Sequence, residues 1–323
     1  MKALAVFSGG LDSMMAAKLI RAQDIEVLAL FFETPFFSSN QARRSAEVID
    51  LPIRVCDITR SHLEMVKNPP HGYGGNMNPC IDCHAMMFRE AGQMLKEERA
   101  DFIITGEVLG QRPMSQNKNA LSVVEKESGL KGLILRPLSA LCLPPTIPEE
   151  RGWVDRGALL GISGRSRKPQ MALAEKFNIK EYPSPAGGCL LTDQVFSRRL
   201  KDLLSSRPDV EVREIELLKL GRHFRLAPQL KLIVGRNQEE NEVIRSLAGD
   251  KDRLLSTVNV PGPTTLLMGD PSPEMERFAA SITVSYSDAK DQGPTEIRLS
   301  EGKNERDIKA EGQDKEGFRK YMI

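Results

Sequence analysis

Short apolar runs alternate with amphipathic stretches along the first third of the chain. The apolar runs predict strands over residues 3–7, 26–32, 53–57 and 102–105. Apolar residues at helical spacing predict helices over residues 14–21, 40–49 and 85–98. Because strand, helix and strand follow at short intervals, we expect right-handed crossovers and parallel strands. The predicted fold is α/β, with a parallel sheet covered by helices on both faces.

Breaks rich in proline and glycine interrupt this pattern. Residues 66–79 (VKNPPHGYGGNMNP) predict a long irregular loop, and a loop of that length in a compact domain is more often functional than not. Two further breaks follow, at residues 144–148 and 182–188.

Beyond the last break the pattern changes to a helix near residues 196–205 and shorter strand-like runs. We therefore expect a first domain over residues 1–195 and a C-terminal α+β domain over residues 196–323. The tail from Asp288 onward is charged, and is expected to be weakly ordered or to form an edge element.

Composition and charge narrow the class of protein. The 323 residues are 40% hydrophobic, and 45 Lys and Arg against 44 Asp and Glu leave a formal charge of +1, so nucleic-acid binding would require a local patch. No stretch approaches the roughly 20 apolar residues of a membrane span, and no signal-peptide pattern is present. We expect a cytoplasmic protein with no membrane partner. There, five cysteines favour metal binding or catalysis over disulfides.

Residues 8–13 read SGGLDS and lie between a predicted strand and a predicted helix. Two glycines let the backbone approach a phosphate chain, and the helix adds the positive end of its dipole. The serines can donate to phosphate oxygens, and Asp12 is placed to help bind magnesium. No lysine follows the glycines, so this is not a Walker loop. The segment predicts a site for ATP and Mg²⁺ formed by Ser8, Gly9, Gly10, Leu11, Asp12 and Ser13.

Three cysteines occur in turn-like contexts suited to chemistry. Cys80 and Cys83 form a C-x-x-C at the start of a predicted helix, and Cys189 follows two glycines. They could hold an iron–sulfur cluster with one open iron position, or two of them could form a persulfide and its resolving thiol. A structural zinc, with His84 as fourth ligand, is the third interpretation. Cys56 and Cys142 lie among apolar residues and are expected in the core.

The loop at residues 8–13 resembles that of the PP-loop ATP pyrophosphatases. This resemblance implies cleavage of ATP between the α and β phosphates, with AMP transferred to an oxygen. The stretches CIDCHAMMFREAG and ITGEVLGQRPMSQNKNAL are most similar to 4-thiouridine synthases of the ThiI type. In families where C-x-x-C is joined by one later cysteine, the three typically bind a [4Fe–4S] cluster, which implies Cys80, Cys83 and Cys189 as its ligands here. We expect this chain to depart from the longer ThiI proteins in having no ferredoxin-like, THUMP or rhodanese-like domain.

Further contacts to the nucleotide are expected around this loop. Adenine should lie near Phe31 and Phe32 at the end of the second strand, largely against backbone. Gly106 and Gln111 belong to the TGE-x-LGQ segment at the same edge. Arg165 and Lys168 open a helix, where cations are unfavourable unless an anion lies between them. They are expected to bind ATP phosphates or the tRNA backbone.

The second domain carries a local excess of positive charge. Residues 198–236 hold ten Lys and Arg against five Asp and Glu, which fits contact with a phosphate backbone. The segment LKLIVGRNQEENEVI resembles the RNA-binding R domain of NFACT proteins. This similarity implies tRNA contact, first through Arg222, Arg225 and Arg236.

Together these features predict an ATP-dependent tRNA sulfurtransferase, with 4-thiouridine as the product. A uridine oxygen would be adenylated and then replaced by sulfur from a cluster or a persulfide, with Asp12 and the three cysteines as catalytic residues. The sulfur would come from a cysteine desulfurase or inorganic sulfide, and the chain could pair as a homodimer. The alternatives are 2-thiouridine synthesis, or an amide-forming PP-loop enzyme with a zinc site.

Overall fold

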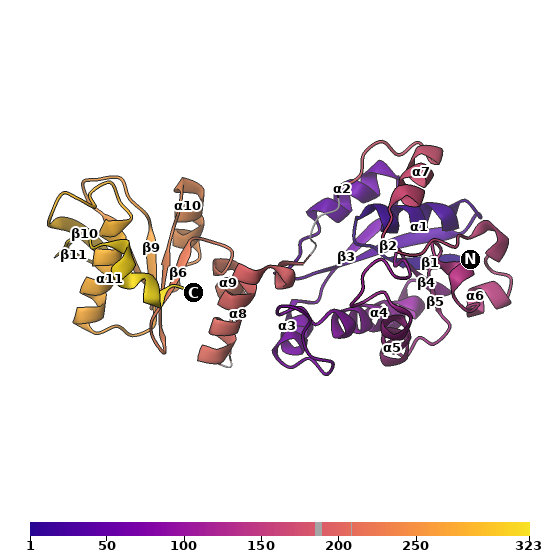
Figure 1. Ribbon diagram of the computed structural model, residues 1–323, viewed down its shortest axis with the longest axis horizontal. Helices are drawn as coiled ribbons and strands as arrows, with labels where there is room; N and C mark the ends of the chain where they lie inside the picture. Colours follow the sequence, from indigo (N-terminus) through magenta and orange to yellow (C-terminus); the bar gives the residue numbers. More distant parts are fainter. Residues whose placement is uncertain (185–188, 208) are drawn as a thin grey trace. The chain divides into compact units, whose positions relative to one another are not determined.

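The computed structural model describes residues 1–184, 189–207 and 209–323 (Figure 1). Within this part of the chain there are two compact units, Met1–Thr192 and Asp193–Ile323. None of their described helices is long and apolar enough to cross a membrane. The glycine-rich residues just before Cys189, on which part of the sequence argument rested, lie outside the described residues.

The first unit is built on a five-stranded sheet in the order β3-β2-β1-β4-β5. Every neighbouring pair is parallel, and the strands are β1 (Lys2–Val6), β2 (Glu26–Glu33), β3 (Ile53–Asp57), β4 (Phe102–Thr105) and β5 (Ile134–Leu135). Val6, the last residue of β1, pairs with Leu30 on one side and Thr105 on the other. The predicted α/β class with a parallel sheet is confirmed.

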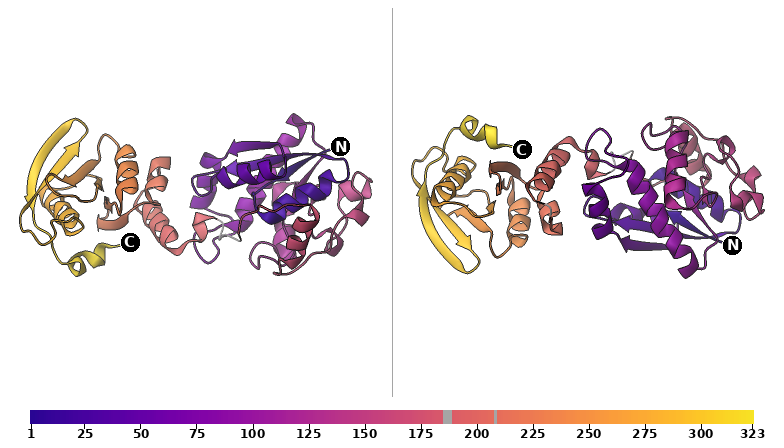
Figure 2. Two further views of the ribbon diagram at one scale, coloured as in Figure 1. Left: turned by 90° about the horizontal axis from the view of Figure 1, so that it is seen from above. Right: turned by 90° about the horizontal axis from the view of Figure 1, so that it is seen from below.

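Helices cover both faces of this sheet. They are α1 (Leu11–Arg21), α2 (Asn40–Val48), α3 (Thr59–Lys67), α4 (Cys80–Glu97), α5 (Lys118–Ser128), α6 (Ile147–Glu150) and α7 (Lys168–Lys176). Three short 3-10 helices, at residues 140–142, 156–158 and 190–192, complete the unit. The views in Figures 1 and 2 place α1, α2 and α7 on one face and α4 and α5 on the other. The helices over residues 59–67 and 118–128 were not predicted.

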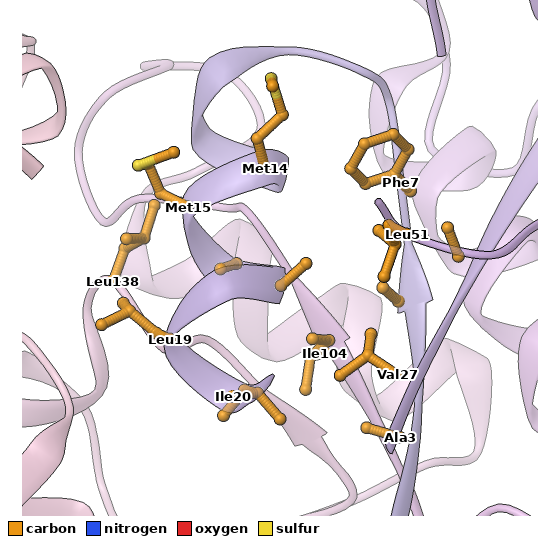
Figure 3. Close-up of a cluster of buried hydrophobic side chains, with 14 of the residues drawn as sticks. Ala3, Phe7, Met14, Met15, Leu19, Ile20, Val27, Leu51, Ile104 and Leu138 are labelled. Carbon is orange, nitrogen blue, oxygen red and sulfur yellow. The ribbon is translucent and has the colours of Figure 1, made fainter. Parts of the chain in front are cut away.

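The alternation of side chains along β1 explains the two layers. Ala3, Ala5 and Phe7 pack with α1, where Met14 and Ile20 are fully buried (Figure 3). Leu4 points to the opposite face and joins a second cluster with Phe88 of α4. Because β1 is buried on both sides, its sequence is apolar from Ala3 to Val6, as expected of a central parallel strand.

The second unit contains a six-stranded antiparallel sheet in the order β11-β10-β8-β9-β7-β6. Its strands are β6 (Arg222–Ala227), β7 (Leu230–Val234), β8 (Arg253–Thr257), β9 (Thr265–Met268), β10 (Thr295–Glu301) and β11 (Asn304–Ala310). Its helices are α8 (Gln194–Ser206), α9 (Val212–Leu217), α10 (Gln238–Ser246), α11 (Pro273–Ser285) and the 3-10 helix η4 (Lys315–Tyr321). The predicted α+β class is confirmed.

Helix α11 and helix α10 pack in separate hydrophobic clusters of this second unit. Ala279 and Ile282 of α11 lie in one cluster with Leu232 and Phe318, whereas Ile244 of α10 lies in another with Ile233. Leu232 and Ile233 are neighbours in β7, so these two helices cover opposite faces of the sheet. The charged tail forms β10, β11 and η4. Of the two forms expected for it, the edge element is observed, because β11 is the outermost strand.

Candidate active site

Residues 8–13 form the turn from β1 into α1. Gly9 has φ +75°, and a Cβ there would lie 2.6 Å from the Cα of Ala42, so only glycine fits. Gly10 is the N-cap of α1, and no side chain caps the helix there. Ser13 instead donates its hydroxyl to the carbonyl of Gly10 at 2.8 Å. The first N–H groups of this helix therefore lack a side-chain cap, as they do at helix ends that bind anions.

The end of β4 touches this turn directly. A Cβ on Gly106 would lie 2.4 Å from the backbone N of Ser13, so a side chain would push the two segments apart. Farther along the same segment, Gln111 donates its Nε2 to Oδ2 of Asp12 at 2.7 Å. The side-chain amides of Gln111 and the fully buried Gln170 are also in contact, at 3.3 Å. Gly106 and Gln111 thus meet the predicted ATP loop, while Gln170 had no signal in the sequence.

The basic segment before α7 lies beside the same loop. Gly164 donates its backbone N–H to the carbonyl of Leu109 at 2.7 Å, two residues before Gln111. Arg165 and Lys168 are exposed, and neither forms an ion pair within the described residues. Both side chains are therefore free to meet an anion.

Phe32 is in a different situation from the other predicted nucleotide contacts. It is 3% exposed, and its side chain packs in the cluster that contains Leu4 and Phe88. Its ring is therefore committed to the core. Only its backbone, beside Cys56 of β3, remains for a nucleotide.

The three predicted cysteines come together from two segments. Cys80 is the first residue of α4, Cys83 lies one turn later, and Cys189 immediately precedes the 3-10 helix at residues 190–192. Burial raises the pKa of Cys83 well above its ordinary value, and negative charge on Cys189 and Cys80 would raise it further. Burial also raises the pKa of Cys189, to about 11, and Cys80 adds to this. The thiols are thus close enough to influence one another electrostatically.

The loop between α3 and α4 contacts both cysteine segments; it covers residues 68–79, because residues 66 and 67 of the predicted loop belong to α3. Asn76 donates its side-chain Nδ2 to the carbonyl of Thr192 at 2.7 Å, and Asn78 donates to Sγ of Cys80 at 3.3 Å. Loop residues next to C-x-x-C therefore fix both cysteine segments. The remaining two cysteines, Cys56 and Cys142, are half-buried, and Sγ of Cys56 lies 3.8 Å from Sδ of Met94.

His62 is a neighbour of the cysteines that the sequence did not reveal. It is fully buried, and its Nε2 lies 3.3 Å from Sγ of Cys83. Burial lowers the pKa of His62 to about 4, so the ring is neutral at physiological pH. In the sequence, His62 is a single histidine in an amphipathic stretch, and this pattern alone does not indicate a contact with a cysteine.

The predicted metal site can be tested against these contacts. In residues 1–184, 189–207 and 209–323, no three His, Cys, Asp or Glu side chains are arranged as a ready metal site. The donor chemistry nevertheless suits iron or zinc, because thiolates are soft ligands and the three thiols are near enough to affect one another's pKa values. Buried thiols with raised pKa values need a cation to stay ionised, and a bound metal provides one. The residues present therefore fit a cluster, although they are not preassembled.

A buried charged network links the cysteine helix to the end of β4. Glu107 is 4% exposed; it accepts a hydrogen bond from Nδ1 of His84 at 2.8 Å and one from Nε of Arg136 at 3.0 Å. Burial acts to raise the pKa of Glu107, but Arg136 and His84 outweigh it, and the pKa lies below its usual range. His84, considered above as a fourth zinc ligand, thus commits Nδ1 to Glu107. The importance of Arg136 was missed.

The second unit places the three predicted RNA-contact arginines very differently. Arg225 binds Asp202 through two hydrogen bonds of 3.0 and 2.6 Å. Arg236 pairs with Glu240, with Nε 2.9 Å from Oε1. Arg222 has no ion pair among the described residues, and its guanidinium lies 4.7 Å from the ring centre of Tyr286.

Family models match both parts of the chain. Residues 1–142 match the model described as "Thiamine biosynthesis protein (ThiI)", and residues 221–322 match "NFACT protein RNA binding domain". The two resemblances inferred from the sequence are therefore confirmed.

Curated relatives cover less than half of this chain. A probable tRNA sulfurtransferase of Methanosarcina mazei is 31% identical over 118 residues, which cover 34% of this chain and 29% of the relative. One from Moorella thermoacetica is 31% identical over 150 residues, or 43% of this chain and 36% of the relative. The chain thus spans about a third of the length of these relatives. A solved 4-thiouridine synthetase–RNA complex with bound ATP aligns over 43% of this chain and 37% of its own, at 26% identity and a TM-score of 0.36.

Proposed function

We propose that this chain, with its ThiI-type first part and its NFACT-type RNA-binding part, is an ATP-dependent tRNA uridine sulfurtransferase. The favoured product is 4-thiouridine. Residues 1–195 would form the catalytic domain and residues 196–323 the tRNA-binding domain. The relatives named as tRNA sulfurtransferases support this assignment.

One observation carries the proposal: the end of β4 connects the nucleotide loop to the cysteine helix. Gly106 packs on Ser13, and the next residue, Glu107, binds His84 one turn after Cys80. Groups suited to activating an oxygen and groups suited to delivering sulfur therefore share one edge of the sheet. Such an edge is where ligands of open parallel sheets bind.

In the first step, the loop of residues 8–13 would bind ATP, with its phosphates at the N-terminal end of α1. Asp12, positioned by Gln111, would hold Mg²⁺. Arg165 and Lys168 would contact the phosphates from the side. The uridine O4 attacks the α-phosphorus, the bond to the β-phosphate oxygen breaks, and pyrophosphate leaves.

In the second step, sulfur replaces the activated oxygen, which departs as part of AMP. Cys80, Cys83 and Cys189 would hold a [4Fe–4S] cluster, which when bound would supply an open iron position for hydrosulfide. Hydrosulfide carries sulfur at the oxidation level of the product, so this route needs no reductant. A persulfide route would instead leave a disulfide and would require an added thiol.

The first test concerns adenylation. Asp12→Asn is expected to reduce tRNA-dependent pyrophosphate release by about 100-fold or more, because it removes the proposed magnesium contact. The measurement is release of labelled pyrophosphate from ATP with an unmodified tRNA transcript. Glu47→Gln, an exposed change in α2, is the control and should keep full activity. Full activity of Asp12→Asn would contradict the adenylation role.

The second test concerns sulfur delivery. Cys83→Ser and Cys189→Ser should each lower thiolation by about 1000-fold while leaving pyrophosphate release nearly unchanged. Cys142→Ser, another half-buried free cysteine, is the matched control. Nucleoside analysis of the tRNA product separates 4-thiouridine from 2-thiouridine. An amide product formed without tRNA would overturn the proposal in favour of the amide-forming class.

A further inference from the structure

Most cations counted in the basic segment of the second unit are neutralised within the unit. The pairs are Arg207–Glu214, Arg213–Asp252, Lys219–Glu216, Arg225–Asp202, Lys231–Asp202 and Arg236–Glu240. A cation held by a carboxylate must give it up before it can bind a phosphate. The segment's charge excess therefore does not by itself provide an RNA surface.

A second group of cations lies on aromatic rings instead of carboxylates. Nζ of Lys315 and the guanidinium of Arg222 are each 4.7 Å from the ring centre of Tyr286. Neither forms an ion pair within the described residues. The two cationic groups can therefore be no farther apart than twice 4.7 Å. This upper limit is about one Debye length at 0.1 M salt. Two like charges gathered on one ring favour an anion that binds both.

The ring that gathers these cations is held firmly. Tyr286 packs against Phe224 of β6 and Phe318 of η4, with ring centres 6.3 and 5.9 Å away. Phe318 is 1% exposed, so it anchors η4 in the core. Arg222 and Lys315 therefore come from two segments that a shared aromatic cluster fixes in place.

A similar arrangement recurs two turns away along α11. Tyr321 of η4 packs edge-on against Phe278 of α11 at 5.5 Å, and Nζ of Lys320 lies 5.1 Å from the Tyr321 ring centre. Phe278 and Tyr286 are separated by about 12 Å along the helix axis. The two aromatic sites thus form a short track between α11 and η4.

We propose that this track is the RNA-contact surface of the second unit, and that it binds a single-stranded or looped segment of the tRNA. We call it the Tyr286 surface and define it by Arg222, Tyr286, Lys315, Lys320 and Tyr321. Unpaired RNA presents phosphates beside exposed base faces, and proteins bind it with cations and aromatic rings in alternation. The inference rests on the proposed tRNA partner and narrows the three arginines chosen from sequence to one, Arg222.

The test uses the full chain and two labelled RNAs, an unmodified tRNA transcript and a 12-nucleotide oligouridylate. The double variant Arg222→Gln, Lys315→Gln should bind both RNAs at least tenfold more weakly, because two phosphate contacts are lost. Its salt dependence should also become shallower, by about 1.5 in the slope of log affinity against log salt. The control, Lys303→Gln with Lys309→Gln, removes equal charge from the β10–β11 hairpin, which forms the opposite edge of the sheet from β6.

Several outcomes would overturn the inference. One is binding by the Arg222/Lys315 variant within twofold of the unchanged chain. Another is an equal loss in the control variant. Polyglutamate that competes as well as oligouridylate would assign the surface to acidic proteins instead.

The assay also separates this inference from the proposed function. If the chain binds RNA through the Tyr286 surface but forms no thiouridine, the proposed function fails and the inference stands. If it forms thiouridine and the double variant binds and reacts normally, only the inference fails.

Discussion

The two units use charged and polar residues in opposite ways. In the first unit, Asp12, Gln111 and the cysteines lie on loops and a helix start beside the ends of parallel strands. In the second unit, Asp202 of α8 accepts hydrogen bonds from both Arg225 and Lys231 of the sheet. The arrangement in the first unit leaves polar groups available to a ligand. In the second unit, the ion pairs attach helix α8 to the sheet. A count of charged residues therefore indicates function only where the fold leaves those residues unpaired.

Of the three changes that test this comparison, the largest effect is expected at the close contact between the end of β4 and the nucleotide loop. Gly106→Ala would place a Cβ 2.4 Å from the backbone N of Ser13, so the nucleotide loop or the end of β4 must shift. A misplacement of this kind is expected to lower tRNA-dependent pyrophosphate release by about 100-fold. Gly75→Ala is the control, because no atom lies within 4 Å of its added Cβ. Equal activity of the two variants would show that this contact does not position the loop.

The next effect concerns stability in the second unit. Asp202→Asn leaves Arg225 and Lys231 without their shared carboxylate, and Lys231 is only 4% exposed. We expect the free energy of unfolding to fall by about 2 kcal/mol, since uncompensated buried charge is costly. Chemical denaturation followed by circular dichroism measures it. Asp307→Asn, which breaks the exposed pair with Arg298, should cause no measurable change. Similar losses in both variants would remove the distinction between buried and exposed pairs.

The smallest expected effect is a pH dependence of stability, which arises from Lys231 beside Asp202. Burial lowers the pKa of Lys231 to about 8, from an ordinary value near 10.5. Between these values the unfolded chain holds the proton that the folded chain has released, so this group makes stability rise with pH. The gain from pH 7.5 to 9.5 should be smaller in Lys231→Met, by on the order of 1 kcal/mol. An unchanged gain would show that Lys231 titrates normally.

Much of the first unit could be predicted from sequence because parallel sheets obey strong rules. Apolar runs gave β1 to β4, and the carboxyl ends of such strands must share an edge. The motifs at residues 8–13 and 105–107 were therefore expected to meet, and Gly106 does pack on Ser13. The family models confirm both resemblances drawn from segments of the sequence.

Other side-chain contacts of the candidate site could not be predicted from the local sequence. His62 beside Cys83, Gln170 beside Gln111, and Arg136 on Glu107 join residues far apart in the chain or on unpredicted helices. Their residue types are also common in ordinary surface or core positions. The pattern of apolar residues along the sequence predicts which positions of a helix or strand are buried. It does not predict which polar side chains will contact one another.

The sequence by itself determined the α/β architecture and the loop of residues 8–13, and it predicted which cysteines could act together. These follow from local geometry, since glycines, helix starts and apolar periods act over a few residues. Only the tertiary structure decided which cations remain free, because an ion pair depends on approach across the fold. Arg225 and Arg236 bind carboxylates, whereas Arg222 and Lys315 both lie against the ring of Tyr286.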